Sequence, residues 1–153
     1  MVAESYFDYE SPGDTGKPLV LLEHWGDHAW EALLGHASRH RVIKGDHLLR
    51  EGQPDPRLYI VASGQLEVLS GNRRRPLIAA VGPGGVVGEV RFFDNGPASA
   101  DVRAAEETVV LGITREAFEA FAGHHPDLGR DLLFDLGRIC SLRLRRMTTL
   151  ALG

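Results

Sequence analysis

Hydrophobic and polar residues alternate over short intervals in the central part of the chain. Between residues 41 and 113, runs rich in Val, Ile, Leu and Tyr are separated by turns that contain Gly, Pro, Asp or Asn. Leu66 and Val68 alternate with Gln65 and Glu67, the pattern of a strand with one buried and one solvated face. Turn signals at intervals of roughly eight to twelve residues are typical of a compact antiparallel sandwich or barrel. We therefore expect an antiparallel β-roll or jelly roll over about residues 41–113.

The spacing of apolar residues becomes helical on either side of this region. Before it, Asp27 is placed to cap a helix whose apolar residues share one face: Trp30, Leu33, Leu34 and Ala37. After it, Thr114 can cap a short helix that Gly123 ends, and Pro126 is placed to begin a longer helix. The fold class is therefore mainly β, with an N-terminal helix and a long C-terminal helix flanking the roll.

The long helix that begins at Pro126 carries a wider apolar stripe than one packing face needs. Its members are Leu128, Leu132, Leu133, Leu136, Ile139, Cys140, Leu144, Met147 and Leu150. We expect part of the stripe to cover the roll and the remainder to meet a second copy of the chain. The arginines at positions 138, 143, 145 and 146 are expected to form the solvated face of this helix, with one of them available for a further role.

Residues 1–18 show no periodicity and mix aromatic residues with Ser, Pro, Gly and Asp. They are expected to form a mobile arm, although Tyr6, Phe7 and Tyr9 can dock on the domain or on a partner. Residues 19–153 are expected to form a single domain, with the C-terminal helices over about residues 114–150.

Composition and charge agree with one ordinary globular domain, since 43% of the 153 residues are hydrophobic and 25% are charged. The net charge of −4 gives no general attraction to nucleic acid or acidic membranes, so neither partner is expected. The single cysteine, Cys140, excludes an internal disulfide and fits a reducing compartment. No apolar run reaches membrane-spanning length or resembles a signal peptide, and we expect a cytoplasmic protein.

Candidate catalytic chemistry is sparse in this sequence. A metal-dependent barrel enzyme needs several histidines and a carboxylate directed into the barrel, and only His47 lies in the predicted strands. Histidines 24, 28, 36 and 40 suggest a metal site, but no carboxylate or cysteine cluster accompanies them, and a solvated helix face is expected instead. There is no nucleophile elbow and no Walker loop. No catalytic residue, metal site or obligatory cofactor is expected.

A glycine-rich stretch over residues 82–104 is the strongest candidate for ligand binding. It reads GPGGVVGEVRFFDNGPASADVRA, and the acidic Glu89 directly follows Gly88. Glycines allow tight turns whose backbone N–H groups approach a ligand closely, which suits a phosphate group. The alternative interpretation is a glycine-rich connection between two strands.

Further motifs occur in a fixed order around this stretch: Gly45-Asp46 with Glu51-Gly52, Tyr59-Ile60-Val61 with Gly64, Gly82-Pro83-Gly84 before Gly88-Glu89, and Ser99 to Ala104 after it. Together they resemble the cyclic-nucleotide-binding domain of catabolite-activator-like proteins, cyclic-nucleotide-dependent kinases and gated channels. The first two pairs resemble the family's early hairpins, and the last two resemble the entrance to and exit from its phosphate-binding cassette. The resemblance covers about residues 33–150 and implies a stand-alone regulatory domain without a helix-turn-helix.

The resemblance also implies a binding site. Glu89 would accept a hydrogen bond from the ribose 2′-hydroxyl, and Ser99 with nearby backbone N–H groups would hold the cyclic phosphate. By register from Pro126, the helix residue that closes over the base falls near Arg143 and Leu144. The implied ligand is cAMP or cGMP, and the implied ligand-binding residues are Val87, Gly88, Glu89, Val90, Arg91, Ala98, Ser99, Ala100, Arg143 and Leu144.

Two positions depart from the family's pattern. The family reads Pro-Arg-Ser-Ala where this chain has Pro97-Ala98-Ser99-Ala100, so Ala98 replaces the arginine that pairs with two phosphate oxygens. Losing that forked bond costs about 2–4 kcal/mol of binding free energy. The second departure is Arg91, where the family usually has a small residue. Its side chain is expected to restore the missing charge, to fill the pocket or to point into solvent, and the sequence does not decide among these.

Two functions remain open from the sequence. In the first, a cyclic nucleotide binds the roll, the long helix shifts, and a partner protein responds to the change. In the second, the domain binds no ligand and serves as a scaffold that dimerises or docks through the long helix, with Leu136 and Leu144 at the contact.

Overall fold

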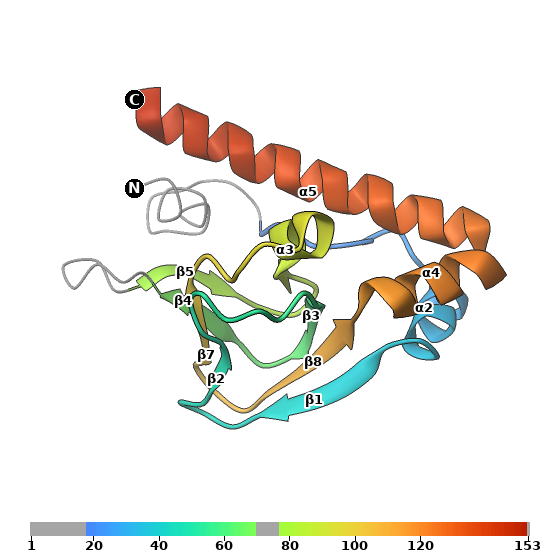
Figure 1. Cartoon of the computed structure of the whole chain (residues 1–153), viewed down its shortest axis with the longest axis horizontal. Helices are drawn as coiled ribbons and strands as arrows, with labels where there is room; N and C mark the ends of the chain where they lie inside the picture. Colours follow the sequence, from blue (N-terminus) through green and yellow to red (C-terminus); the bar gives the residue numbers. More distant parts are fainter. Residues whose placement is uncertain (1–17, 70–76, 153) are drawn as a thin grey trace.

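The strands form two four-stranded antiparallel sheets in the computed structural model, which describes residues 18–69 and 77–152 (Figure 1). One sheet has the strand order β1-β8-β3-β6 and the other has the order β2-β7-β4-β5. The strands are β1 Ser38–Val42, β2 His47–Leu49, β3 Leu58–Ser63, β4 Leu66–Leu69, β5 Leu77–Val81, β6 Val86–Val87, β7 Asp101–Ala104 and β8 Thr108–Ile113. The antiparallel roll expected from the turn spacing is confirmed.

Within the described ranges, four helices flank the roll: α2 Asp27–Leu34, α3 Glu89–Asp94, α4 Arg115–His124 and α5 Pro126–Leu152. Thr114 caps α4 as predicted, because its Oγ1 accepts a hydrogen bond from the backbone N–H of Ala117 at 3.0 Å. Pro126 begins α5, also as predicted, at a position where its missing N–H costs no helical hydrogen bond. The short α4 runs one residue beyond Gly123, to His124.

The hydrophobic core is shared by both sheets and by α5, which lies across the roll (Figure 1). Strand residues such as Leu58 and Leu66 are fully buried. From α5, the side chains of Leu132, Leu136 and Ile139 are equally buried, so this face of the apolar stripe covers the roll. Leu136 therefore belongs to the core, and its predicted place on a dimer contact is wrong.

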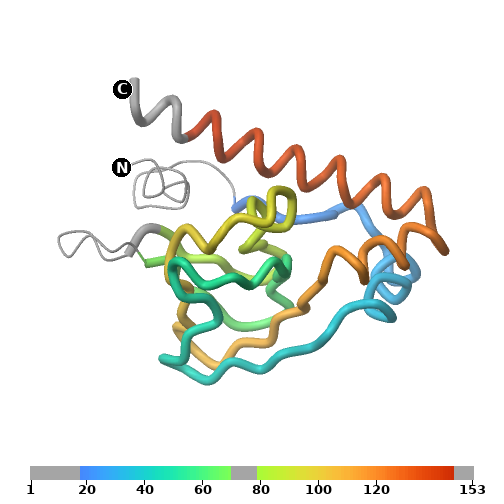
Figure 2. Tube along the Cα trace, viewed as in Figure 1, coloured from blue at the N-terminus to red at the C-terminus, as the bar shows by residue number. Residues whose placement is uncertain are grey.

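The segment just before α2 runs alongside α5 and is fastened to it (Figure 2). The carboxylate of Asp135 accepts a hydrogen bond from the backbone N–H of Leu22. Arg138 donates to the carbonyl of Val20 at 2.9 Å and pairs with Asp135 at 2.7 Å. Burial of Leu19, Leu21 and Leu22 completes this attachment of the chain to the domain.

Three expectations about the N-terminal helix region are corrected by the structure. Asp27 is the first helical residue rather than the cap, and the cap is Gly26, which has no side chain to offer. The helix ends at Leu34, which is 46% exposed, so Ala37 lies beyond it. His40, expected on a helix face, lies in β1, where its ring contacts Tyr59.

Some expectations concern residues outside the described ranges. They include the arm up to residue 17, with Tyr6, Phe7 and Tyr9, and the side chains of Met147 and Leu150 in the apolar stripe. Within residues 18–69 and 77–152, no helix is both long enough and apolar enough to cross a membrane.

Candidate functional site

The turn between β6 and α3, in the glycine-rich stretch, is built around Gly88. Gly88 has φ +80°, a conformation that L side chains rarely adopt. A Cβ at this position would lie 2.6 Å from the carbonyl oxygen of Arg57 and 2.7 Å from Nη2 of Arg91. Glycine is therefore required here both for the backbone turn and for the approach of Arg91. The turn starts α3, so Glu89 and Arg91 project from its first residues.

A small cavity of about 20 Å³ lies beside α3. Its lining residues are Leu49, Val87, Gly88, Glu89, Val90, Arg91, Ala98, Ser99, Ala100 and Val102. Eight of these belong to the ten residues that the sequence implied for ligand binding. The volume holds about one water molecule, so the cavity is closed to a nucleotide in this conformation.

Glu89 forms a buried ion pair with Arg143 of α5. Their side chains are 1% and 0% exposed, and Nη1 of Arg143 lies 2.5 Å from Oε1 of Glu89. Arg143 also donates from Nη2 to the carbonyl of Val86 at 3.0 Å. The expectation that Arg143 belongs to the solvated face of α5 is therefore wrong. Arg143 thus reaches the glycine-rich stretch from α5, and its implied role in closing over a base stays a prediction.

Leu144, unlike the buried Arg143 next to it on α5, lies at the surface. It is 53% exposed and lies outside the described lining of the cavity. The structure therefore brings nine of the ten implied residues together, eight at the cavity and Arg143 through Glu89, and leaves Leu144 at the surface.

Ala98 and Ser99 form another part of the cavity wall. Ala98 is 3% exposed, and its backbone is held on both sides: its carbonyl accepts from Gly52 N at 2.8 Å and its N–H donates to the carbonyl of Gln53 at 3.2 Å. Ser99 is exposed next to it. A buried alanine on a fixed backbone leaves this wall of the cavity without charge.

Arg91 is buried, with 3% of its surface exposed, so the alternative in which it points to solvent is wrong. Nη2 donates to the carbonyl of Arg57 at 3.3 Å, whereas the buried Nη1 has no hydrogen-bond partner among the described residues. Burial lowers the pKa of the Arg91 guanidinium, and the nearby Asp55, Tyr59 and Glu89 oppose that shift. Arginine still remains protonated at neutral pH, so the cavity has a cation in its wall.

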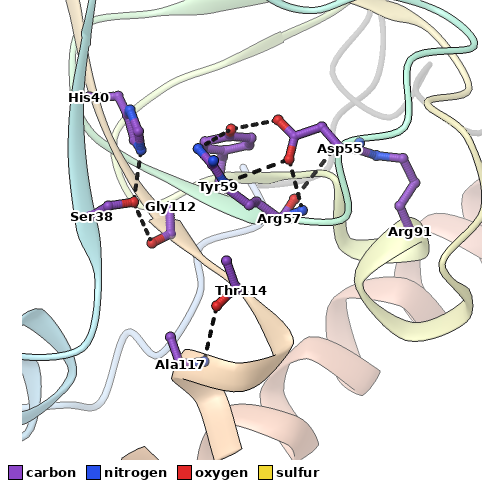
Figure 3. Close-up of polar contacts among 9 residues, drawn as sticks. All are labelled: Ser38, His40, Asp55, Arg57, Tyr59, Arg91, Gly112, Thr114 and Ala117. Carbon is purple, nitrogen blue, oxygen red and sulfur yellow. Dashed lines mark hydrogen bonds and ion pairs between the residues drawn. The ribbon is translucent and has the colours of Figure 1, made fainter.

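A polar cluster supports Arg91 from the loop before β3 (Figure 3). The hydroxyl of Tyr59 donates to Asp55 at 2.8 Å, and Asp55 also accepts from the backbone N–H of Arg57 at 3.2 Å. Burial and the bond to Asp55 raise the pKa of Tyr59 to about 12. These contacts hold the carbonyl of Arg57 in place for Arg91.

In the sequence, Pro54-Asp55-Pro56 is a turn signal, and nothing there connects Asp55, Arg57 or Tyr59 with the site. Arg91 donates its hydrogen bond to the backbone carbonyl of Arg57. Every residue has such a carbonyl, so the sequence does not indicate this contact. Among the described residues, no group of three or more His, Cys, Asp or Glu side chains gathers as a metal site would require.

The chain is similar to bacterial regulators over much of its length. It is 31% identical over 108 residues to the CRP-like cAMP-activated global transcriptional regulator of Mycobacterium tuberculosis, covering 67% of this chain and 45% of that protein. It is 32% identical over 108 residues to the cyclic AMP receptor protein of Thermus thermophilus, covering 69% of this chain and 50% of that protein. The chain thus spans about half the length of these relatives.

The chain is also similar to a solved structure, to a much longer human protein and to a family model. The crystal structure of the Thermus thermophilus catabolite activator protein matches with a TM-score of 0.73 at 26% identity, covering 85% of this chain and 60% of that one. Human patatin-like phospholipase domain-containing protein 6 is 30% identical over 145 residues, which is 89% of this chain but 10% of that protein. The family model described as the cyclic nucleotide-binding domain matches residues 39–125. With its β-roll, its long C-terminal helix and this match over more than half its length, the chain belongs to the cyclic nucleotide-binding domain family.

Proposed function

We propose that this domain is a regulatory sensor that binds cAMP or cGMP at the cavity beside α3 and signals through α5. The ion pair between Glu89 and Arg143 is the observation that carries the proposal. Glu89 is the residue that resemblance assigns to the ribose, and Arg143 belongs to the helix that would close over the base. A ligand hydroxyl that engages Glu89 changes the bond that fastens α5, so the site and the helix are coupled.

Ligand entry on this proposal requires a second conformation. A cavity of about 20 Å³ cannot hold a nucleotide, so the space between α3, Ser99 and α5 must widen. A ligand that binds only the widened state shifts the population toward it. The lid is α5, because its Arg143 crosses to Glu89 and to the carbonyl of Val86.

The signal would be read at the outer surface of α5 by a protein partner or by a second copy of the chain. Leu133, Phe134 and Leu144 of α5 are 40%, 75% and 53% exposed. These three side chains are the apolar surface of α5, and exposed apolar side chains can contact a partner. The Mycobacterium tuberculosis relative is a transcriptional regulator, so the expectation that this chain has no nucleic-acid partner stays a prediction. No catalytic step is part of the proposal, and a cytoplasmic location also stays a prediction.

One observation favours a second candidate, a scaffold that binds no nucleotide. Ala98 leaves its side of the cavity uncharged, and the cavity is closed. On this alternative, the Glu89–Arg143 pair is a permanent fastening of α5, and the apolar surface of α5 carries the function by docking or dimerisation.

The two candidates are separated by calorimetric titration of the protein with cAMP and with cGMP, combined with hydrogen exchange of α5. The sensor predicts saturable binding, a rise in melting temperature by mass action, and altered exchange in α5. Glu89→Gln should weaken binding, whereas Glu116→Gln, an exposed change in α4, should leave it unaltered. Absence of binding at millimolar concentrations of both nucleotides would reject the sensor and leave the scaffold.

A further inference from the structure

We infer that Arg91 is the phosphate-binding cation of this domain and takes over, from the α3 side, the charge that Ala98 does not supply. The inference rests on the proposed function, because it concerns how the same cavity holds a cyclic phosphate. It assigns to Arg91 a specificity role: selection of an anionic nucleotide over an uncharged nucleoside.

The first argument is the state of the Arg91 side chain. A buried charge is costly unless hydrogen bonds and opposite charges surround it. Arg91 is 3% exposed, donates to the carbonyl of Arg57 through Nη2, and has no described hydrogen-bond partner for the buried Nη1. A guanidinium group with a donor left over, in the wall of a cavity, is suited to an anion.

The second argument is that the acidic neighbours of Arg91 are bound to other groups. Asp55 is the acidic neighbour on the β3 side, but its two oxygens accept from the Tyr59 hydroxyl and from the backbone N–H of Arg57. The other acidic neighbour, Glu89, is paired with Arg143 at 2.5 Å. The positive charge of Arg91 is thus only partly compensated, and a phosphate in the cavity would complete the compensation.

The third argument is the arrangement of the cavity walls. Arg91 and Gly88 line the cavity from α3 and the turn before it, and Ala98 and Ser99 line it from the segment before β7. In the widened state that the proposed function requires, a phosphate between these two segments would meet the guanidinium of Arg91 and the Ser99 hydroxyl. The methyl group of Ala98 takes up little of this space, whereas an arginine at position 98 would bring a second cation to the same cavity as Arg91.

Gly88 makes this placement of Arg91 sterically possible. A Cβ on residue 88 would approach Nη2 of Arg91 to 2.7 Å, so the glycine provides the room that the guanidinium occupies. Arg57 completes the support, because its carbonyl orients Nη2 and leaves Nη1 for the ligand. The cluster of Asp55, Arg57 and Tyr59 therefore holds the guanidinium of Arg91 in position (Figure 3).

The experiment compares cAMP, cGMP and uncharged adenosine by calorimetry on the wild type, on Arg91→Gln and on Arg130→Gln. Arg130 is an exposed arginine of α5 and gives a matched control for the same substitution. The wild type and Arg130→Gln should prefer cAMP to adenosine, and Arg91→Gln should lose about 10- to 150-fold in cAMP affinity, the value of one hydrogen bond to a charged group. Its affinity for adenosine should stay within about twofold of the wild type. Adding Ala98→Arg to Arg91→Gln should restore part of the preference.

The remaining outcomes show whether the proposed function fails or the inference alone fails. If no nucleotide binds the wild type, the proposed function fails and the inference fails with it. If Arg91→Gln keeps the wild-type affinity for cAMP, or loses cAMP and adenosine equally, the inference fails while the sensor function stands. Should Arg91→Gln not fold in a thermal melt, Arg91→Met is titrated instead. That variant removes the charge and keeps an unbranched side chain, so an unchanged ratio of cAMP to adenosine affinity would overturn the inference.

Discussion

Oε1 of Glu89 and Nη1 of Arg143 are 2.5 Å apart across a sequence separation of 54 residues. Both side chains are almost completely buried, so this pair fastens the middle of α5 to the glycine turn at the start of α3. The pair joins the candidate ligand-binding stretch to α5. Any change in one partner is therefore transmitted to the other.

Arg143→Met is expected to destabilise the domain strongly, because it leaves the carboxylate of Glu89 buried without its ion-pair partner. The expected loss is about 3–5 kcal/mol of unfolding free energy, measured by urea denaturation. Adding Glu89→Gln to Arg143→Met should recover part of the loss by removing the buried charge. Arg145→Met, an exposed change two residues along α5, is the control. A loss below about 1 kcal/mol for Arg143→Met would show that the pair does not fasten the helix.

The fold was largely predictable, because its signals are local. The strand alternation at Leu66 and Val68, the cap at Thr114 and the helix start at Pro126 each depend on a few neighbouring residues. Strand β1 begins three residues before the predicted start of the roll at about residue 41, since its sequence Ser-Arg-His-Arg-Val shows no apolar alternation and four of its five residues are not buried. It forms because its backbone pairs with β8 along its full length.

The site was predictable as far as its residues carry a motif. Gly88, Glu89 and Ser99 were recognised together, and the structure gathers them around one cavity. The burial of Arg143 was not, because nothing in a helix with several arginines marks the one that faces inward. The support of Arg91 by the carbonyl of Arg57 was beyond sequence reasoning, since it depends on the spatial approach of a backbone atom.

Gly88→Ala is expected to destabilise the domain by at least about 2 kcal/mol, the combined cost of a left-handed alanine and an overpacked contact. The backbone φ is +80°, and the new methyl group would meet the carbonyl of Arg57 and the guanidinium of Arg91. Gly82→Ala is the matched control, because no atom lies within 4 Å of the added Cβ and no left-handed φ is involved. Equal melting temperatures for the two variants would contradict the assigned role of Gly88.

Tyr59 gives a prediction for alkaline pH. Its pKa is raised to about 12 by burial and by the bond to Asp55, whereas an unfolded tyrosine titrates near pH 10. The folded state therefore holds the phenolic proton more tightly, and the stabilisation is complete below about pH 10 and is lost as pH rises towards 12. The loss amounts to about 2–3 kcal/mol over that interval.

The measurement is the unfolding free energy of the wild type and Tyr59→Phe between pH 8 and pH 11.5, roughly the window given by the two pKa values. The wild type should lose stability faster with pH than the variant, since phenylalanine cannot titrate. Absorbance at high pH should show a late tyrosine component that Tyr59→Phe removes. Parallel pH profiles for the two proteins would contradict the raised pKa.

The apolar surface of α5 is the predicted contact with a partner or a second copy, and Phe134 is its most exposed member at 75%. If the chain self-associates through this surface, Phe134→Asp should dissociate the assembly without lowering the melting temperature, because the side chain contributes little to the core. Light scattering after size-exclusion chromatography measures the mass at several concentrations. Phe93→Asp, a similar change at a 46% exposed phenylalanine of α3, is the control and should leave the mass unchanged. Leu136→Asp is unsuitable because that side chain is fully buried and its loss would unfold the domain. An assembly that survives both Phe134→Asp and Leu144→Asp would exclude this face of α5 as the contact.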